Sequence, residues 1–378
     1  MCKEKLALVI DGNWLMMSRF FLKRDCFDSS LDDKILEKGS EQLADLMSQS
    51  ICIVLRQFRD CITNIIFVSD NRSWRKELPI PACVTRDSAT DEYKGTRVRD
   101  DKVVWSYVYK SINLLEERFR DLGFTTVNSY GIEGDDWCWW WSRKLNSEGT
   151  NVLLWTSDED VKQLIQQDPE TGAFTAWFEK SKGVVLNSSM KKQEVDDGDE
   201  LSFFMTPLKV ENNLVNEISK LVKVTYINPS TIINKKIYVG DGGDNILPVF
   251  TYHKGSKTYK ATQKDWEKIV DFNKDSYRDE MWNETTLNEK YNNIYKNKQK
   301  VLGNDVTNID DFIEHINYNR RMVWLDESQI PENIQNQMST VEYKEVSEEV
   351  MHDLKYNYKL LSNSTNNSLK VLMEDVSF

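Results

Sequence analysis

Leu6-Ala-Leu-Val-Ile10 is a short, wholly apolar run that ends directly at a carboxylate, Asp11. Later runs of similar length, rich in β-branched residues, lead in the same way to Asp70, Asp158 and Asp241. Short apolar runs separated by longer helical stretches are typical of parallel strands. They predict an α/β fold with a mostly parallel central sheet flanked by helices, in which ligands bind at the C-terminal strand ends.

The rest of the chain supplies the other elements of this predicted fold. The expected strands are Leu6–Ile10, Ile65–Ser69, Phe124–Val127, Val152–Ser157 and Ile237–Gly240, with a hairpin over Thr175–Val185. Helical periodicity predicts helices over Glu41–Asp60, Val103–Leu122 and Asp135–Leu145. A polar stretch over Ser188–Glu200, followed by an Asn- and Lys-rich helical pattern, places a domain boundary near residue 205. We therefore expect a sheet domain over 1–205 and a mainly helical domain over 206–378.

Charge and cysteine content limit the classes of protein to consider. The 378 residues carry 49 basic and 61 acidic side chains, a net charge of −12. This total argues at first against a nucleic-acid partner, because duplex binders usually present a basic face. The six cysteines form no Cys-x-x-Cys pair and only three histidines are present, so neither a zinc site nor a disulfide framework is indicated. No run is long enough for a signal peptide or a membrane span, and we expect a reduced, cytoplasmic location.

Acidic residues gather where the predicted strands end. The set is Asp11, Asp70, Glu133, Asp135, Asp136, Asp158, Asp160, Asp241 and Asp244. If these carboxylates converge, they repel one another unless cations neutralise them. All-oxygen ligands favour Mg²⁺, with Mn²⁺ as a substitute, and two such ions suit the hydrolysis of a phosphodiester. Much of the negative charge would then belong to the metal site itself.

Any one of these acids, taken alone, is more often a helix cap or a turn former than a ligand. Their order along the chain changes that judgement. Five short motifs resemble, in sequence order, the acidic signatures of the 5′ to 3′ exonuclease and flap endonuclease family. They are Ile10–Asn13, Val68–Asp70, Glu133–Asp136, Ser157–Asp160 and Gly240–Asn245.

Within that family the chain is most similar to the branch of T-even bacteriophage ribonucleases H, which are 5′ nucleases. The segments that carry this likeness are Ser73–Lys76, Tyr93–Arg97, Tyr318–Arg320 and Ile330–Ile334. The resemblance implies a PIN-like sheet domain with an arch over about 71–110, under which the 5′ strand passes. It also implies a divergent helix-hairpin-helix-like C-terminal domain that binds DNA.

The resemblance also divides the acids between two metal regions. A tighter region would be held largely by Asp11, Asp70, Asp135, Asp136 and Asp158. The second ion or its water shell would be held by Asp160, Asp241 and Asp244, and Glu133 fits either region.

Basic residues of the predicted arch and hairpin are the other candidates. Lys94 and Arg97, taken as one helical turn apart, would both face the scissile phosphate as catalytic residues, and Arg75 would hold the phosphate or the 5′ end. Structural ion pairing is the rival interpretation for each. Candidates for DNA binding are Arg72, Lys76, Lys254, Lys257 and Lys260, with a solvated lysine face as the alternative.

The function that the resemblance implies is metal-dependent 5′ to 3′ hydrolysis of RNA primers in RNA–DNA hybrids and of DNA flaps during replication. The expected partners are DNA or RNA–DNA hybrid with a 5′ single-stranded end and a single-stranded-DNA-binding protein, with the enzyme itself a monomer. One alternative is a catalytically silent module that binds DNA structures. Another is a haloacid-dehalogenase-like phosphatase, because Val239–Asn245 resembles a late motif of that fold, although its nucleophile motif needs an aspartate where Asn13 stands.

Overall fold

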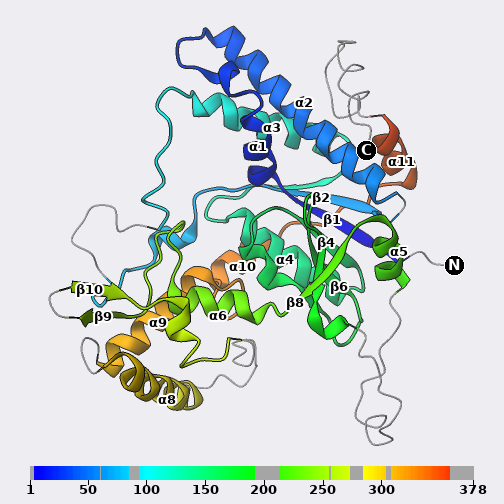
Figure 1. Cartoon of the computed structure of the whole chain (residues 1–378). Coiled ribbons are helices and arrows are strands. Elements are labelled where there is room, and N and C mark those ends of the chain that lie inside the picture. The colour runs from blue at the N-terminus through cyan, green and yellow to red at the C-terminus, as the bar shows by residue number, and fades with distance from the viewer. Residues whose placement is uncertain are drawn as a thin grey trace, which may run out of the picture.

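A central mixed sheet organises the chain, and most of its strand pairs are parallel (Figure 1). The computed structural model describes residues 4–59, 61–84, 93–191, 213–254, 257–272, 284–303 and 308–357. The sheet order is β3-β2-β1-β4-β6-β7-β8, with β5 paired to β6. The strands are β1 Leu6–Asp11, β2 Asn64–Val68, β3 Thr125–Val127, β4 Asn151–Trp155, β5 Gln166–Gln167, β6 Phe174–Glu179, β7 Gly183–Asn187 and β8 Val224–Ile227.

Parallel pairing brings the carboxyl ends of the central strands to one edge. Strand β1 pairs in parallel with β2, where Asp11 lies opposite Val68, and with β4, where Ile10 lies opposite Trp155. The residues that follow β2 and β4 therefore lie beside Asp11. Strands β6 and β7 are antiparallel and form the predicted hairpin, whereas β7 and β8 are parallel. The predicted fold class, a mostly parallel sheet flanked by helices with a helical C-terminal region, is confirmed.

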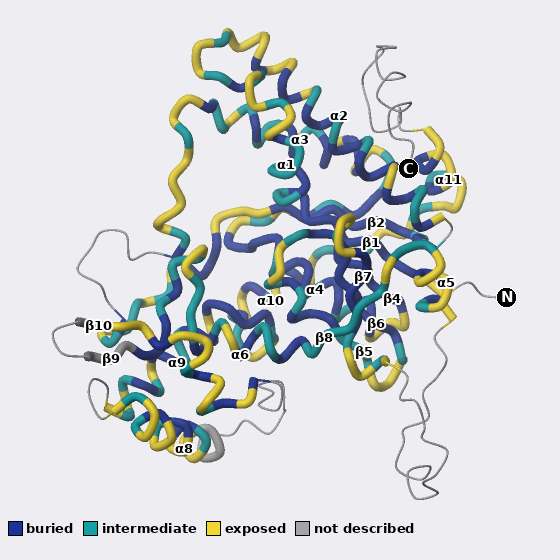
Figure 2. The backbone as a smooth tube through the Cα atoms, viewed as in Figure 1, coloured by how far each residue is buried: buried dark blue, intermediate teal, exposed yellow. Residues whose placement is uncertain are grey.

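The alternation of side chains along β1 assigns a helical layer to each face of the sheet. Leu6, Leu8 and Ile10 pack with α1 Gly12–Phe20, α2 Asp33–Gln57 and α3 Trp105–Asp121 on one face. Ala7 and Val9 pack with α4 Gly134–Ser147 on the other. Burial follows this layering, because the central strands β1, β2 and β4 are buried throughout while the helices expose their outer sides (Figure 2).

A separate apolar cluster lies beside the sheet and is built mainly from the chain after residue 229, with Tyr93 from the first half. It contains Trp266, Tyr238, Tyr291 and Phe312. Its elements are α6 Ser230–Val239, β9 Thr251–Lys254, β10 Lys257–Lys260, α7 Gln263–Trp266, α8 Glu284–Leu302 and α9 Ile309–Val323. The prediction of a strand over Ile237–Gly240 was wrong, because these residues end α6. Ile233, Ile237 and Tyr238 are all buried in this cluster, whereas in a strand the adjacent residues Ile237 and Tyr238 would point to opposite faces.

The second half of the chain also returns to the sheet. Strand β8 extends it, and α5 Asn213–Leu221 and α11 Glu348–Tyr356 pack on the face that α2 covers. Helix α10 Glu332–Ser339 packs on the α4 face. The domain boundary expected near residue 205 falls within 192–212, outside the described residues. Among the helices that the structure describes, none has the length and apolarity needed to cross a bilayer.

Candidate metal centre

Asp11 and Asp70 anchor the site at the ends of β1 and β2. Asp11 caps α1, where one carboxylate oxygen accepts a hydrogen bond of 2.9 Å from the Trp14 amide and the other accepts one of 2.9 Å from the Thr156 hydroxyl. Asp70 accepts a 2.6 Å hydrogen bond from the amide of Gly134, the first residue of α4. A Cβ atom on Gly134 would lie 2.9 Å from Asp70 Oδ1, so only glycine permits this approach.

Four aspartates at this edge form what we call the first carboxylate group. They are Asp11, Asp70, Asp135 and Asp158. Burial raises the pKa of Asp11 to about 7, and the charges of Asp70 and Asp158 add to the effect. Burial and the same neighbours raise the pKa of Asp135 well above its ordinary value, and the pKa of Asp70 is also raised, first by burial.

The described part of the chain places no basic side chain in an ion pair with these four acids. The charge of Lys94 offsets part of the repulsion at Asp70 and Asp135, and the rest is relieved by protonation or by a bound cation. Four carboxylates without nitrogen or sulfur ligands have the donor chemistry that a hard divalent cation requires. The first group thus fits such an ion.

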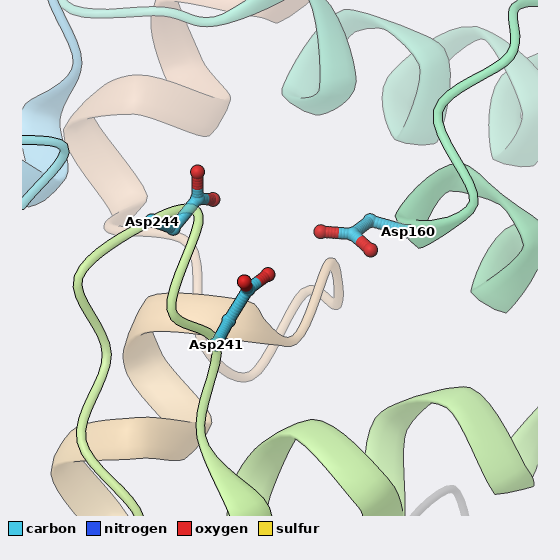
Figure 3. Close-up of side chains that lie close together, drawn as sticks. All are labelled: Asp160, Asp241 and Asp244. Carbon is cyan, nitrogen blue, oxygen red and sulfur yellow. The ribbon is translucent and has the colours of Figure 1, made fainter. Parts of the chain in front are cut away.

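A second carboxylate group lies next to the first and consists of Asp160, Asp241 and Asp244 (Figure 3). One oxygen of each lies within 4.8 Å of the others. Asp160 opens the 3₁₀ helix η3 Asp160–Leu164 after β4, whereas the other two follow α6. The two groups are joined because the Asp160 amide donates a 2.9 Å hydrogen bond to Asp158. These oxygens also fit a divalent cation.

The second group, unlike the first, carries its own counter-ions. The ammonium of Lys236 bonds Asp160 and Asp241 at once, and Arg97 Nη2 lies 2.6 Å from Asp244 Oδ1. Burial raises the pKa of Asp160 to about 6 although Lys236 opposes that shift. Lys236 was missed by sequence reasoning. The sequence marks Lys236 only as a lysine five residues before Asp241, and such a spacing is too common to be informative.

Glu133 and Asp136, which the sequence also placed among the ligands, are closed off from solvent. Asp136 is fully buried and accepts hydrogen bonds from Trp74 Nε1 at 3.1 Å and from Arg75 Nη2 at 2.8 Å. Glu133 accepts hydrogen bonds from Ser73, Arg75 and Lys94. Burial alone would raise the pKa of Glu133, but Lys94 and Arg75 lower it to about 2. Both carboxylates are therefore committed to ion pairs in this structure.

Arg75 is buried together with them, with 3% of its surface exposed. Its guanidinium bonds Glu133, Asp136 and, through Nε at 3.0 Å, the carbonyl of Met322. The rival interpretation of structural ion pairing therefore describes its contacts here. A guanidinium enclosed in this way does not face a phosphate.

Lys94 and Arg97 do reach the site, but not from a helix. They lie in a turn, with the Arg97 amide bonded to the Lys94 carbonyl at 3.2 Å and Lys94 at a positive φ of 57°. The expectation of one helical turn was wrong. The Lys94 amide bonds the carbonyl of Asp244 at 3.0 Å, which fixes the turn beside the second group, and Lys94 Nζ lies 2.5 Å from Glu133 Oε1.

The predicted DNA-binding residues whose side chains are described form no ion pair with the site carboxylates. Arg72 and Lys76 flank the buried Arg75 and are exposed, and Lys260 is exposed at the end of β10. Lys254 and Lys257 are opposite each other in the β9–β10 hairpin, and their side chains are outside the described part of the chain.

No protein-family model matches the chain, and no curated protein matches it. Three similar solved structures come from bacteriophage T5. A T5 protein co-crystallised with metal ions is 15% identical, with a TM-score of 0.44, over 95% of this chain and 100% of that one. The T5 5′-exonuclease with bound zinc ions is also 15% identical, with a TM-score of 0.44, over 94% of this chain and 100% of that one. The T5 flap endonuclease in a complex with DNA and metal ions is 15% identical, with a TM-score of 0.44, over 95% of this chain and 100% of that one.

Proposed function

We propose that the chain is a divalent-cation-dependent 5′ nuclease. The observation that carries the proposal is the pair of carboxylate groups at one sheet edge, joined through Asp158 and Asp160, with Lys94 and Arg97 beside them. Among the common classes of enzyme, phosphodiester hydrolases have the greatest need for two adjacent all-carboxylate groups with cationic side chains at their rim.

In the proposed mechanism the first group and the second group would each hold one cation. Mg²⁺ or Mn²⁺ bound there would supply Lewis acidity to an attacking water and to the leaving oxygen. The ammonium of Lys94 and the guanidinium of Arg97 then neutralise charge on the scissile phosphate, and both are already held at the site by carboxylates. Arg75 acts as a positioning residue, because it fixes Glu133, which in turn holds Lys94.

The substrates we propose are RNA primers in RNA–DNA hybrids and DNA flaps, acted on near their 5′ ends. Support for this finer assignment, and for the T-even ribonuclease H branch, is the sequence resemblance described above. The exposed Arg72, Lys76 and Lys260 would contact the phosphate backbone. A PIN-like catalytic domain, an arch over about 71–110, a single-stranded-DNA-binding protein as partner and a monomeric state belong to the same proposal.

Two alternatives make different predictions. A silent binding module has no need of a repulsive carboxylate group, which costs stability in the absence of cations. A haloacid-dehalogenase-like phosphatase needs a second aspartate after Asp11, but Asn13 stands there and accepts a 2.9 Å hydrogen bond from the Asp70 amide. The geometry favours the nuclease over both.

The experiment that tests the proposal incubates the protein with a 5′-labelled DNA flap and with an RNA–DNA hybrid, in Mg²⁺, Mn²⁺ or chelator. We expect cleavage only with a divalent cation, and 5′-phosphorylated products. Asp160→Asn should abolish cleavage and retain DNA binding, whereas Asp121→Asn, a matched change at the exposed end of α3, should leave both unchanged. Binding without cleavage by the unmodified protein would favour the silent module.

A further inference from the structure

Lys236 occupies an unusual position for a lysine next to a candidate metal site. Its side chain is 17% exposed and reaches from α6 to bond Asp160 on η3 and Asp241 in the loop after α6. Both contacts use the Oδ2 atoms, so the ammonium lies between two carboxylates that would otherwise repel each other.

The contrast with the first carboxylate group is sharp. Asp160, Asp241 and Asp244 have two internal cations, Lys236 and Arg97. The first group has no ion pair among the described residues. In its described part, the chain therefore supplies ion-paired cations to the second group and none to the first.

The Oδ2 atoms of Asp160 and Asp241 cannot bond Lys236 and a shared divalent cation at once. A divalent cation needs carboxylate oxygens at about 2.0 to 2.6 Å. The Lys236 ammonium contacts Oδ2 of each acid, so a cation that binds both acids through these two atoms must displace it. The displaced ammonium would stay on α6 at the rim of the site, where a phosphate could accept its hydrogen bonds.

We propose that Lys236 is an internal counter-ion that competes with the second divalent cation for Asp160 and Asp241. This inference rests on the proposed function, since it assumes that the second group binds a cation. It follows that the first group fills at lower cation concentration than the second. Nucleic acid and the second cation also bind cooperatively, because a phosphate stabilises the ammonium that the cation displaces.

The same ion pairs join two parts of the fold. Asp160 lies at the sheet edge. Lys236 lies on α6 and Asp241 in the loop after it, and α6 packs in the apolar cluster of α6 to α9. Asp160 and Asp241 need a positive charge between them both before and after the cation binds. Lys236 supplies it before, and the cation supplies it after. The exchange therefore keeps α6 attached to the sheet while it frees the lysine.

The test measures Mn²⁺ binding to the full chain by electron paramagnetic resonance of the free ion. We compare the unmodified protein, Lys236→Met and Lys235→Met, a control at the exposed neighbouring position on α6. We expect one tighter and one weaker ion for the unmodified protein and for Lys235→Met. In Lys236→Met the weaker ion should bind at least about fivefold more tightly, because its competitor is gone.

An unchanged weaker constant in Lys236→Met, with two ions still bound, would overturn the role of Lys236 and leave the nuclease proposal intact. Failure of the unmodified protein to bind any Mn²⁺ would overturn the proposed function instead, and the role of Lys236 with it.

A second measurement does not depend on the folding of that variant. Lysine side chains of the unmodified protein are labelled with ¹³C at Cε, and the Lys236 signal is assigned by its loss in Lys236→Arg. We expect this signal to move in step with occupancy of the second ion during a Mg²⁺ titration. A Lys236 signal that stays in place while two ions bind would overturn the proposal.

Discussion

The guanidinium of Arg75 bonds both carboxylate oxygens of Asp136, Nη1 to Oδ2 at 3.1 Å and Nη2 to Oδ1 at 2.8 Å. This bidentate pair is buried, and Arg75 Cζ lies 4.5 Å from the centroid of the Trp74 ring. The same guanidinium also bonds Glu133 and the Met322 carbonyl. It joins the start of α4 to η2 Trp74–Glu77 and to α9. The sequence suggested that Arg75 binds the substrate, but its guanidinium instead holds these elements together beneath the site.

The buried pair makes a prediction about stability. Arg75→Met should lower the free energy of unfolding by about 3 to 5 kcal/mol, because Asp136 and Glu133 lose their buried counter-ion. The change is measured by urea unfolding in chelator. Arg72→Met, three positions earlier and exposed, is the matched control and should change it by less than about 0.5 kcal/mol. Equal effects of the two changes would contradict the structural role of Arg75.

Two adjacent acids should respond to the same substitution with opposite signs. Asp136→Asn leaves Arg75 without its bidentate partner and should destabilise the fold by about 3 kcal/mol. Asp135→Asn removes one of four mutually repelling carboxylates and, at about pH 8 in chelator, should stabilise it by about 1 kcal/mol. Thermal unfolding of the two variants side by side provides the check. The same sign for both would show that the four-acid group does not repel as described.

The contrast between Asp135 and Asp136 also marks the limit of sequence reasoning. The sheet and its acidic edge could be predicted, because apolar runs that end in aspartate specify strands and the parallel arrangement brings their ends together. Which of two neighbouring acids faces the cleft depends on helix phase and on a distant arginine. Neither is encoded locally.

The errors have similar causes. Ile237–Gly240 has the composition of a strand end, but burial of the adjacent residues Ile237 and Tyr238 in the same α6 to α9 cluster selects a helix. Lys94 was placed on a helix by its spacing from Arg97, whereas a bond from its amide to the Asp244 carbonyl, 150 residues away in sequence, holds it in a turn. Long-range contacts decided each of these positions.

A buried histidine predicts how stability depends on pH. Burial lowers the pKa of His315 to about 4, from about 6.5 in the unfolded chain. Between these two pH values the unfolded state binds a proton that the folded state does not bind. The free energy of unfolding therefore falls as the pH drops from about 6.5 to about 4. The loss should be roughly 2 to 3 kcal/mol relative to His315→Gln. Urea unfolding of both proteins across this pH range measures it, and parallel curves would contradict a neutral buried imidazole.

Lys94 and Lys76 should separate catalysis from binding. Lys94→Met should lower the single-turnover cleavage rate about 100- to 1,000-fold with little change in the Kd for a flap duplex, because its ammonium lies at the carboxylate site. Lys76→Met, at an exposed position outside the site, should weaken binding and leave the saturated rate unchanged. A Lys94 variant that only weakens binding would show that this lysine does not act on the reacting phosphate.

The central claim is that the first carboxylate group makes the chain a cation-dependent nuclease. Its most direct test is single-turnover cleavage of a 5′-labelled flap duplex by the unmodified protein and by Asp135→Asn, each at saturating Mg²⁺ and in chelator. We predict release of a short 5′ product by the unmodified protein with Mg²⁺ alone, and a rate at least about 1,000-fold lower for Asp135→Asn. Cleavage in chelator, or equal rates for the two proteins, would contradict the claim.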